Sequence, residues 1–300
     1  MRRTVFALLL VPSLLVPACK LESHARVDSI HAMNEGVKHY KKNNLSAAEA
    51  ALKEAIKIDP TNSKAYDQLG TLMRKQERWA DAEAAYRSAI DNMGDGKVGK
   101  YYYELGLVQN QLAHGEGITR QAFEQKANEA ISTFDQSLKI DPNLYRAHYM
   151  MGRLYEELDQ PEQADQAYRA SIALNGAFTP PLVALGNMYI DYGFSNVAMA
   201  VLEAGTKANP TDAGVWKGLG EALQNLNRTQ EAVDAYKKAI KIDPDQADVY
   251  FSLGMTYAEL RQKAEATEAL ENFLKKAGGT APEHTVKAAN DTIARMQDAI

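Results

Sequence analysis

The sequence AGVWKGLGEALQNLNRTQEAVDAYKKAIKIDP, residues 213–244, decides the fold because its pattern recurs along the chain. Glycines follow one another at intervals of 34 residues, and so do alanines 12 residues further on. The positions are Gly152, Gly186, Gly220 and Gly254, with Ala164, Ala198, Ala232 and Ala266. Small residues allow two helices to cross closely, and the Ile-Asp-Pro at 242–244 ends a helix because proline lacks an amide proton. The pattern therefore predicts a pair of helices in every period.

Three further copies of the pattern precede these four. The first covers about Ser29–Pro60, the second has Gly70 and Ala82, and the third has Gly106 and Ala130. The two halves of the third copy lie 12 residues further apart than in the others, owing to an insertion near residues 113–124. Such an insertion is either a tolerated loop or a segment that carries binding, and the residues leave both interpretations open.

This pattern resembles the tetratricopeptide repeat (TPR) over residues 29–278. The resemblance implies an all-α fold, a right-handed α-solenoid of about seven helix-turn-helix repeats. A single helix pair cannot bury its apolar face, so stability comes from stacking several pairs. Residues 281–300 are expected to form one more helix, which caps the last repeat. Its apolar residues recur at spacings of three and four and so share one face: Val286, Ala289, Ile293, Met296 and Ile300.

Residues 1–19 resemble a bacterial lipoprotein signal. Arg2 and Arg3 precede an apolar run that is shorter than the roughly 20 residues needed to cross a bilayer, and Val16-Pro17-Ala18-Cys19 is similar to a lipobox. The resemblance implies a lipid (palmitate) anchor on Cys19, followed by a polar tether at residues 20–28. Lys20, in place of the Asp that retains such proteins in the inner membrane, implies the outer membrane, facing the periplasm. Ordinary cleavage after Ala18, which leaves a soluble secreted protein, is the alternative.

Several classes of function are disfavoured by composition and motifs. A formal net charge of −5 argues against nucleic acid as a partner, and a single cysteine excludes an internal disulfide and a cysteine-rich metal site. Residues 94–100 (GDGKVGK) have the glycine spacing of a phosphate-binding loop, but Tyr101 stands where a Ser or Thr is needed and no strand is expected before them. The histidines are scattered, and no nucleophile motif is present. We expect no cofactor, no metal site and no enzyme activity.

The resemblance also locates a binding surface. In TPR arrays the first helix of each repeat lines the concave face, and its second, fifth, ninth, twelfth and thirteenth places point into the groove. Mapping those places predicts a basic and aromatic centre with a more apolar far end, which suits an extended peptide with acidic groups. The residues are Lys64, Arg74, Lys75, Lys100, Tyr103, Asn110, Arg146, Tyr149, Arg153, Val183 and Ile190, with Phe251 and Met255 in the seventh repeat. Ordinary solvated helix faces are the alternative.

Taken together, the two resemblances imply an outer-membrane TPR lipoprotein, similar in architecture to the pilotins that help assemble the type IV pilus secretin. We expect a non-catalytic scaffold that mediates protein–protein interaction and helps assemble or position an envelope complex. The alternative is an adaptor that recruits peptidoglycan hydrolases or proteases in the periplasm. The residues do not identify the partner.

Overall fold

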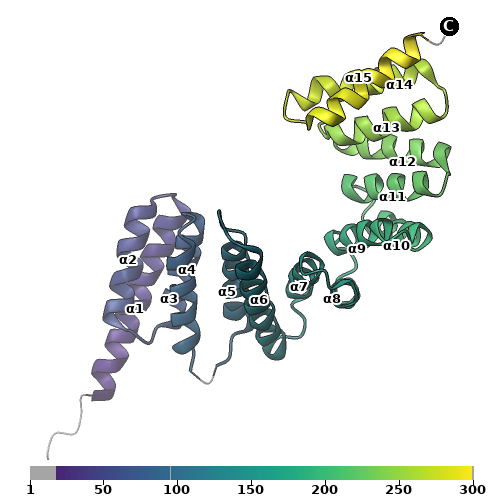
Figure 1. Ribbon diagram of the computed structural model, residues 1–300. Helices are drawn as coiled ribbons and strands as arrows, with labels where there is room; N and C mark the ends of the chain where they lie inside the picture. Colours follow the sequence, from purple (N-terminus) through teal and green to yellow (C-terminus); the bar gives the residue numbers. More distant parts are fainter. Residues whose placement is uncertain (1–17, 95, 299–300) are drawn as a thin grey trace, which may run out of the picture. The chain divides into compact units, whose positions relative to one another are not determined.

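The computed structural model describes residues 18–94 and 96–298, and all regular secondary structure in these ranges is helical (Figure 1). This confirms the all-α fold class. Residues 1–17 of the expected signal lie outside the described residues. Among the residues that are described, no helix is both long and apolar enough to cross a membrane.

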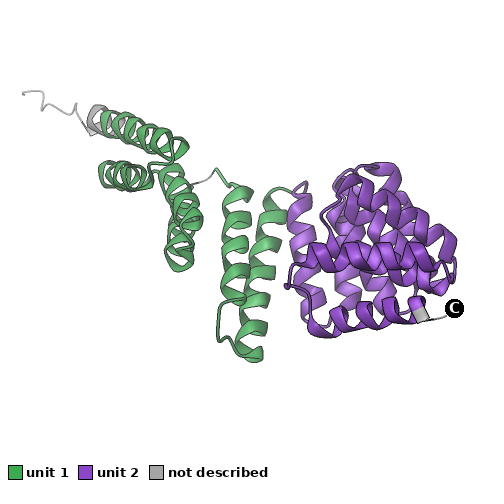
Figure 2. Ribbon diagram, turned by 90° about the horizontal axis from the view of Figure 1, so that it is seen from above, with its two compact units in different colours: residues 1–141 green, residues 142–300 purple. Residues whose placement is uncertain are grey.

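The helices divide into two compact units, Met1–Asp141 and Pro142–Ile300 (Figure 2). The first unit contains α1 (Ala18–Lys41), α2 (Leu45–Ile58), α3 (Ser63–Lys75), α4 (Trp79–Asp91), α5 (Gly99–Ala113) and α6 (Arg120–Ile140). The second contains α7 (Tyr145–Glu157), α8 (Pro161–Leu174), α9 (Pro180–Asp191), α10 (Ser195–Ala208), α11 (Ala213–Asn225), α12 (Thr229–Ile242), α13 (Ala247–Glu259), α14 (Lys263–Ala277) and α15 (Glu283–Asp298). Each odd-numbered helix up to α13 is the first helix of a repeat, and the helix after it is the second.

The recurring glycine makes room for a large side chain of the second helix in each repeat. A Cβ atom added to Gly220 on α11 would lie 2.5 Å from the ring of Tyr236 on α12, whose side chain is fully buried. The same Cβ test gives 2.5 Å between Gly152 and Tyr168 and 2.7 Å between Gly186 and Leu202. The large residue of the second helix therefore packs directly on the glycine of its own repeat, and only glycine fits there.

The turn between the two helices has one shared geometry in six of the seven repeats. A residue with left-handed backbone stands in it: Asn43, Glu77, Asp159, Asn227 and Arg261, with φ of 57–59°, and Gly193, with φ of 79°. The next residue donates its N–H to a carbonyl five residues back, as Arg228 does to Leu223 at 2.9 Å. These bonds satisfy carbonyl groups that the helix end leaves open, so the turn is fixed by the backbone itself.

Three segments that depart from the repeat are helical in whole or in part. Residues 20–28, expected as a tether, lie within α1, and the expected insertion near 113–124 ends in the first turns of α6. That helix has 21 residues where α4 has 13, so part of the insertion lengthens the second helix of the third repeat. The last helix, α15, buries Ala289 in an apolar cluster with Phe273 of α14.

Candidate protein-binding surfaces

Eleven of the predicted groove residues lie on the first helices of four repeats, and Phe251 and Met255 lie on the first helix of a fifth. Within each unit, first helices of neighbouring repeats contact one another, as α1 does α3 and as α9 does both α7 and α11. Six of the predicted residues belong to the first unit: Lys64, Arg74, Lys75, Lys100, Tyr103 and Asn110. The other five belong to the second unit: Arg146, Tyr149, Arg153, Val183 and Ile190. Each unit therefore has its own candidate surface.

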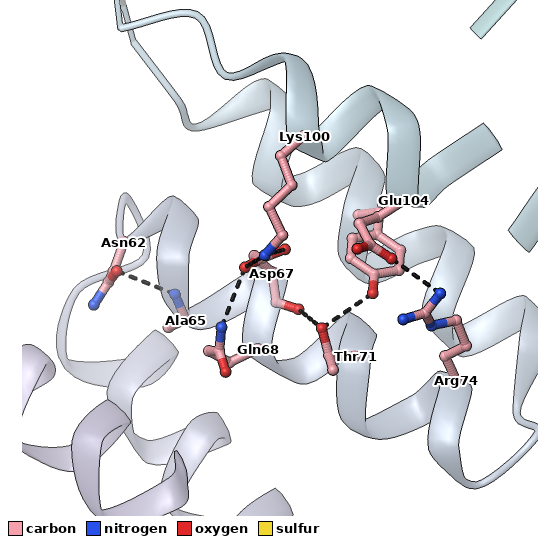
Figure 3. Close-up of polar contacts among 9 residues, drawn as sticks. Asn62, Ala65, Asp67, Gln68, Thr71, Arg74, Lys100 and Glu104 are labelled. Atoms are coloured by element: carbon pink, nitrogen blue, oxygen red, sulfur yellow. Dashed lines mark hydrogen bonds and ion pairs between the residues drawn. The ribbon is translucent and has the colours of Figure 1, made fainter. Parts of the chain in front are cut away.

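On the first unit, Lys100 of α5 forms an ion pair with Asp67 of α3 (Figure 3). Its Nζ lies 3.0 and 3.3 Å from the two carboxylate oxygens, and only 4% of Asp67 is exposed. The Thr71 hydroxyl donates to the backbone carbonyl of Asp67 at 3.0 Å and shares a hydrogen bond with the Tyr86 hydroxyl at 3.1 Å. A buried carboxylate without its cation is strongly destabilising, so Lys100 has a structural role in joining two repeats.

A second pair joins the same two helices in the opposite direction. Arg74 of α3 lies 3.0 Å from the carboxylate of Glu104 on α5 (Figure 3). Burial raises the pKa of Glu104 above its ordinary value, although the nearby charge of Arg74 acts to lower it. Two cations expected to face an acidic partner are thus held by carboxylates of the neighbouring repeat. The surface of α3 and α5 has mixed charge.

The remaining residues of the first unit make looser contacts. Lys75 donates to the side-chain oxygen of Asn43 at 2.9 Å and lies 4.8 Å above the ring of Tyr40. Lys64 is exposed at the mouth of a polar cavity of about 340 Å³. The ring of Tyr103 packs 5.9 Å from that of Phe134, and the backbone carbonyl of Asn110 accepts a hydrogen bond from the His114 ring at 2.7 Å.

On the second unit, Arg146 and Tyr149 of α7 belong to an aromatic cluster. The Arg146 guanidinium lies 5.2 Å from the ring centre of Phe178 and 5.6 Å from that of Tyr145. The ring of Tyr149 meets that of Phe178 edge-on at 5.5 Å and that of Tyr168 at 6.1 Å. Phe178 lies in the loop between α8 and α9. Because only positions on first helices were used to predict the groove, Phe178 could not be identified from the sequence as part of this surface.

The other predicted residues of this unit are mainly packing residues. Arg153 lies 3.5 Å from Glu157 of its own helix. Val183 and Ile190 are half-buried against the large apolar cluster of the unit. Phe251 and Met255, expected at the apolar far end of the groove, pack against the cluster that includes Ala289 of α15. The cap helix therefore uses much of that apolar surface.

Comparison with known proteins identifies the repeat. One model of the tetratricopeptide repeat matches residues 51–84 and 133–166. A second model of the same repeat matches residues 36–62 and 247–275. A further model, described as TPR repeat, matches residues 225–260. The chain contains tetratricopeptide repeats. TPR proteins bind other proteins or peptides, so the surfaces described above are candidate protein-binding surfaces.

Two curated relatives are much longer than this chain. Human tetratricopeptide repeat protein 7A is 28% identical over 54% of this chain and 20% of its own length. Cellulose synthase operon protein C of Xanthomonas axonopodis pv. citri is 25% identical over 68% of this chain and 13% of its own length. The chain thus spans a fifth or less of either relative.

Two solved structures share the fold at low identity. A tetratricopeptide repeat protein from Parabacteroides merdae matches with a TM-score of 0.59 and 16% identity, over 90% of this chain and 99% of its own. PilW, a widely conserved type IV pilus biogenesis factor, matches with a TM-score of 0.56 and 17% identity, over 72% of this chain and 94% of its own. These matches confirm the α-solenoid fold.

Neither a metal site nor a phosphate-binding loop is assembled in the described TPR array. Within residues 18–94 and 96–298, no group of three or more His, Cys, Asp or Glu side chains is arranged to hold a metal ion. The glycine segment at 94–100 joins α4 to α5, so a helix precedes it where a phosphate-binding loop needs a strand.

Proposed function

We propose that this protein is a non-catalytic scaffold that binds a partner protein on the first helices of its second unit. The proposal rests on one observation, the cluster formed by Arg146, Tyr149 and Phe178. Arg146 is exposed, yet its guanidinium stacks on two rings and so loses little conformational freedom when it binds. Arginine and tyrosine are the side chains that most often carry binding energy at protein interfaces. A partner segment with acidic groups suits this surface.

The test is crosslinking in native membranes with a double variant, Arg146→Ala with Arg153→Ala. Tyr149 is kept, because its ring packs on Tyr168 inside the repeat and its loss would disturb the fold. We expect capture of the partner to fall at least about tenfold, as for two interface residues of the kind that dominate binding. The matched control, Lys207→Ala with Lys241→Ala, removes the same charge from second helices and should leave capture unchanged.

Equal capture by the arginine variant and the control would place binding elsewhere. The identity of the captured protein distinguishes the two candidate roles. A secretin or another component of an envelope complex supports a scaffold for assembly. A peptidoglycan hydrolase or a protease supports an adaptor instead.

We further propose that the protein is anchored in the outer membrane, facing the periplasm, through lipid on Cys19. The support is sequence alone: the only cysteine of the chain follows Val16-Pro17-Ala18. More than one acyl chain is needed for stable anchoring. Cys19→Ala should therefore abolish labelling by radioactive palmitate and release the protein from membranes. Unaltered membrane retention would contradict the anchor, and Cys19→Ser serves as a control for side-chain size.

An attractive version of the scaffold role is assembly of a type IV pilus secretin. PilW, which shares the fold, is described as a type IV pilus biogenesis factor, and at 17% identity this likeness supports the architecture alone. Deletion of the gene for this protein should leave secretin subunits as monomers on a denaturing gel run without heating. Unchanged secretin multimers would remove the pilus role and leave the scaffold proposal to the crosslinking experiment.

A further inference from the structure

A second surface of the second unit departs from the rest of the array, at the turn between α9 and α10. Tyr192, Phe194 and Val197 are 54%, 58% and 40% exposed, and we name them the 192–197 patch. They are three of the six large apolar side chains that are exposed among the described residues. These three residues lie within six positions of one another, at the turn and in the first turn of α10, and clustered exposed apolar residues are more typical of interaction sites than scattered single ones.

The other repeats show that the fold does not require these side chains. Phe194 is the N-cap residue of α10, four residues before the recurring alanine Ala198. The same place is polar in all six other repeats: Asn44, Arg78, Lys126, Gln160, Arg228 and Gln262. Asn44 caps its helix by accepting a hydrogen bond from the Ala47 amide at 3.3 Å, but Arg78, Gln160, Arg228 and Gln262 make no side-chain cap, and neither does Phe194. Phe194 therefore differs from its counterparts in being apolar, not in lacking a cap.

The patch borders an open cavity of about 440 Å³ between α8 and the end of α9. Its apolar wall includes Met188, Tyr189, Tyr192 and Phe194, and the rings of Tyr189 and Phe194 meet edge-on at 6.4 Å. The charged residues that line it are both acidic, Glu162 and Asp165 of α8. The cavity therefore combines exposed aromatic rings with negative charge.

The two carboxylates differ in their surroundings. Asp165 accepts hydrogen bonds from the Tyr189 hydroxyl and from Arg169 Nε at 2.8 Å, so its charge is balanced within the protein. Glu162 is exposed, and within the described part of the chain it forms no ion pair. Glu162 stands in the first turn of α8, where a helix stabilises negative charge. Of the two carboxylates, Glu162 is therefore the one that a cation of a partner can approach.

We propose that the 192–197 patch and this cavity bind a protein segment in which a lysine or arginine stands next to an apolar side chain. The apolar side chain would rest on Tyr192 and Phe194, and the cation would lie over a ring and close to Glu162. Cations are attracted to aromatic faces. The negative charge of Glu162 also attracts a cation. An anionic membrane surface or a nucleic acid would be repelled by Glu162. No residue that lines this cavity belongs to the cluster of Arg146, Tyr149 and Phe178.

The experiment is selection of a displayed library of random twelve-residue peptides on the full chain. The library is first depleted on a triple variant, Tyr192→Gln, Phe194→Asn and Val197→Gln. Each change copies a residue that another repeat has at that place, namely Gln76, Asn44 and Gln163, so the variant should fold. We expect the enriched peptides to share a basic residue beside an apolar one.

Two single variants then test the two parts of the surface with one enriched peptide. Phe194→Asn should weaken binding at least about tenfold, as for an aromatic hot spot. Glu162→Gln should weaken it about two- to fivefold, as for an exposed charge pair, and the difference should vanish at about 0.5 M salt. The control, Arg146→Ala with Arg153→Ala, should leave the affinity unchanged.

The proposal is overturned if no peptide is enriched, if the enriched peptides are acidic or lack a basic residue, or if Phe194→Asn binds them as well as the wild type. Two measurements without peptide test whether the patch binds something other than a protein segment of this kind. Dimerisation in sedimentation, lost in the triple variant, would assign the patch to a second copy of this chain. Binding to phosphatidylglycerol vesicles, lost in the same variant, would assign it to a lipid surface. Either result also overturns the proposal.

Discussion

Replacing Gly220 by alanine should destabilise the second unit, although alanine is the better helix former. Gly220 lies inside α11, where the exchange would otherwise stabilise the protein by about 1 kcal/mol. The new methyl group would lie 2.5 Å from the Tyr236 ring and 2.8 Å from a second atom of it. That ring is fully buried, and its hydroxyl donates to Gln224 at 3.2 Å, so it has no free direction in which to move.

The magnitude follows from two opposing effects. Overpacking a well-packed core costs about 1–3 kcal/mol, and a contact below 3 Å with a buried ring places Gly220→Ala at the upper end. Subtracting the gain in helix propensity leaves a net loss of about 2 kcal/mol in the free energy of unfolding. For a unit of about 160 residues this corresponds to a fall in Tm of about 4–8 °C.

Urea unfolding followed by circular dichroism measures the effect, with two controls. Gly214→Ala makes the same substitution in the same helix, where the nearest atom lies 3.2 Å away on the Asp212 side chain, and should stay within about 0.5 kcal/mol of wild type. In a Tyr236→Ala background, the space left by the ring should make Gly220→Ala stabilising. If Gly220→Ala raises the stability of the wild type, or costs the same in both backgrounds, the steric reasoning is wrong.

Two further predictions concern charge and backbone strain. Because burial raises the pKa of Glu104 above its ordinary 4.5, the folded state binds more protons than the unfolded state between that value and the raised pKa. The free energy of unfolding should fall as the pH rises through this window, and Glu104→Gln should remove this fall in urea titrations at pH 4 and pH 7. Arg261 and Gly193 both have left-handed backbone, with φ of 58° and 79°. In thermal melts, Arg261→Gly should therefore stabilise the protein by about 0.5–1 kcal/mol and Gly193→Ala should destabilise it by about 1 kcal/mol.

The repeats could be predicted from sequence because their positions are set by close contacts. In every repeat the recurring glycine faces a Tyr, Phe or Leu side chain of the second helix, and a Cβ atom added to it would lie 2.5–2.9 Å from that side chain, so a larger residue is disfavoured at every period. The division into two units has no comparable signal. Ile-Asp-Pro at 140–142 spans the division, whereas the identical tripeptide at 242–244 lies inside the second unit. The tripeptide controls only how one helix ends, while the packing of one repeat on the next depends on side chains spread over both.

The candidate sites were less predictable because they depend on pairs of residues from different repeats. Lys100 was found as a cation at a groove position, but its partner Asp67 is 33 residues earlier, on the preceding first helix. Asp67 occupies the fifth place of that helix, so comparing places across neighbouring repeats could have revealed the pair. Phe178 could not be found in this way, because it lies in a loop and meets Tyr149 only through the fold.

In a repeat protein, the charge of a first helix is therefore a weak indication of binding, because the neighbouring repeat can neutralise it, as Asp67 does for Lys100. A departure from the repeat's own pattern is a stronger indication. Six repeats have a polar residue at the place of Phe194, and the aromatic side chain there remains 58% exposed although its ring meets that of Tyr189. The contact with Tyr189 covers less than half of Phe194. The exposed part gains free energy only when a partner covers it, which is why we propose this place as a binding surface.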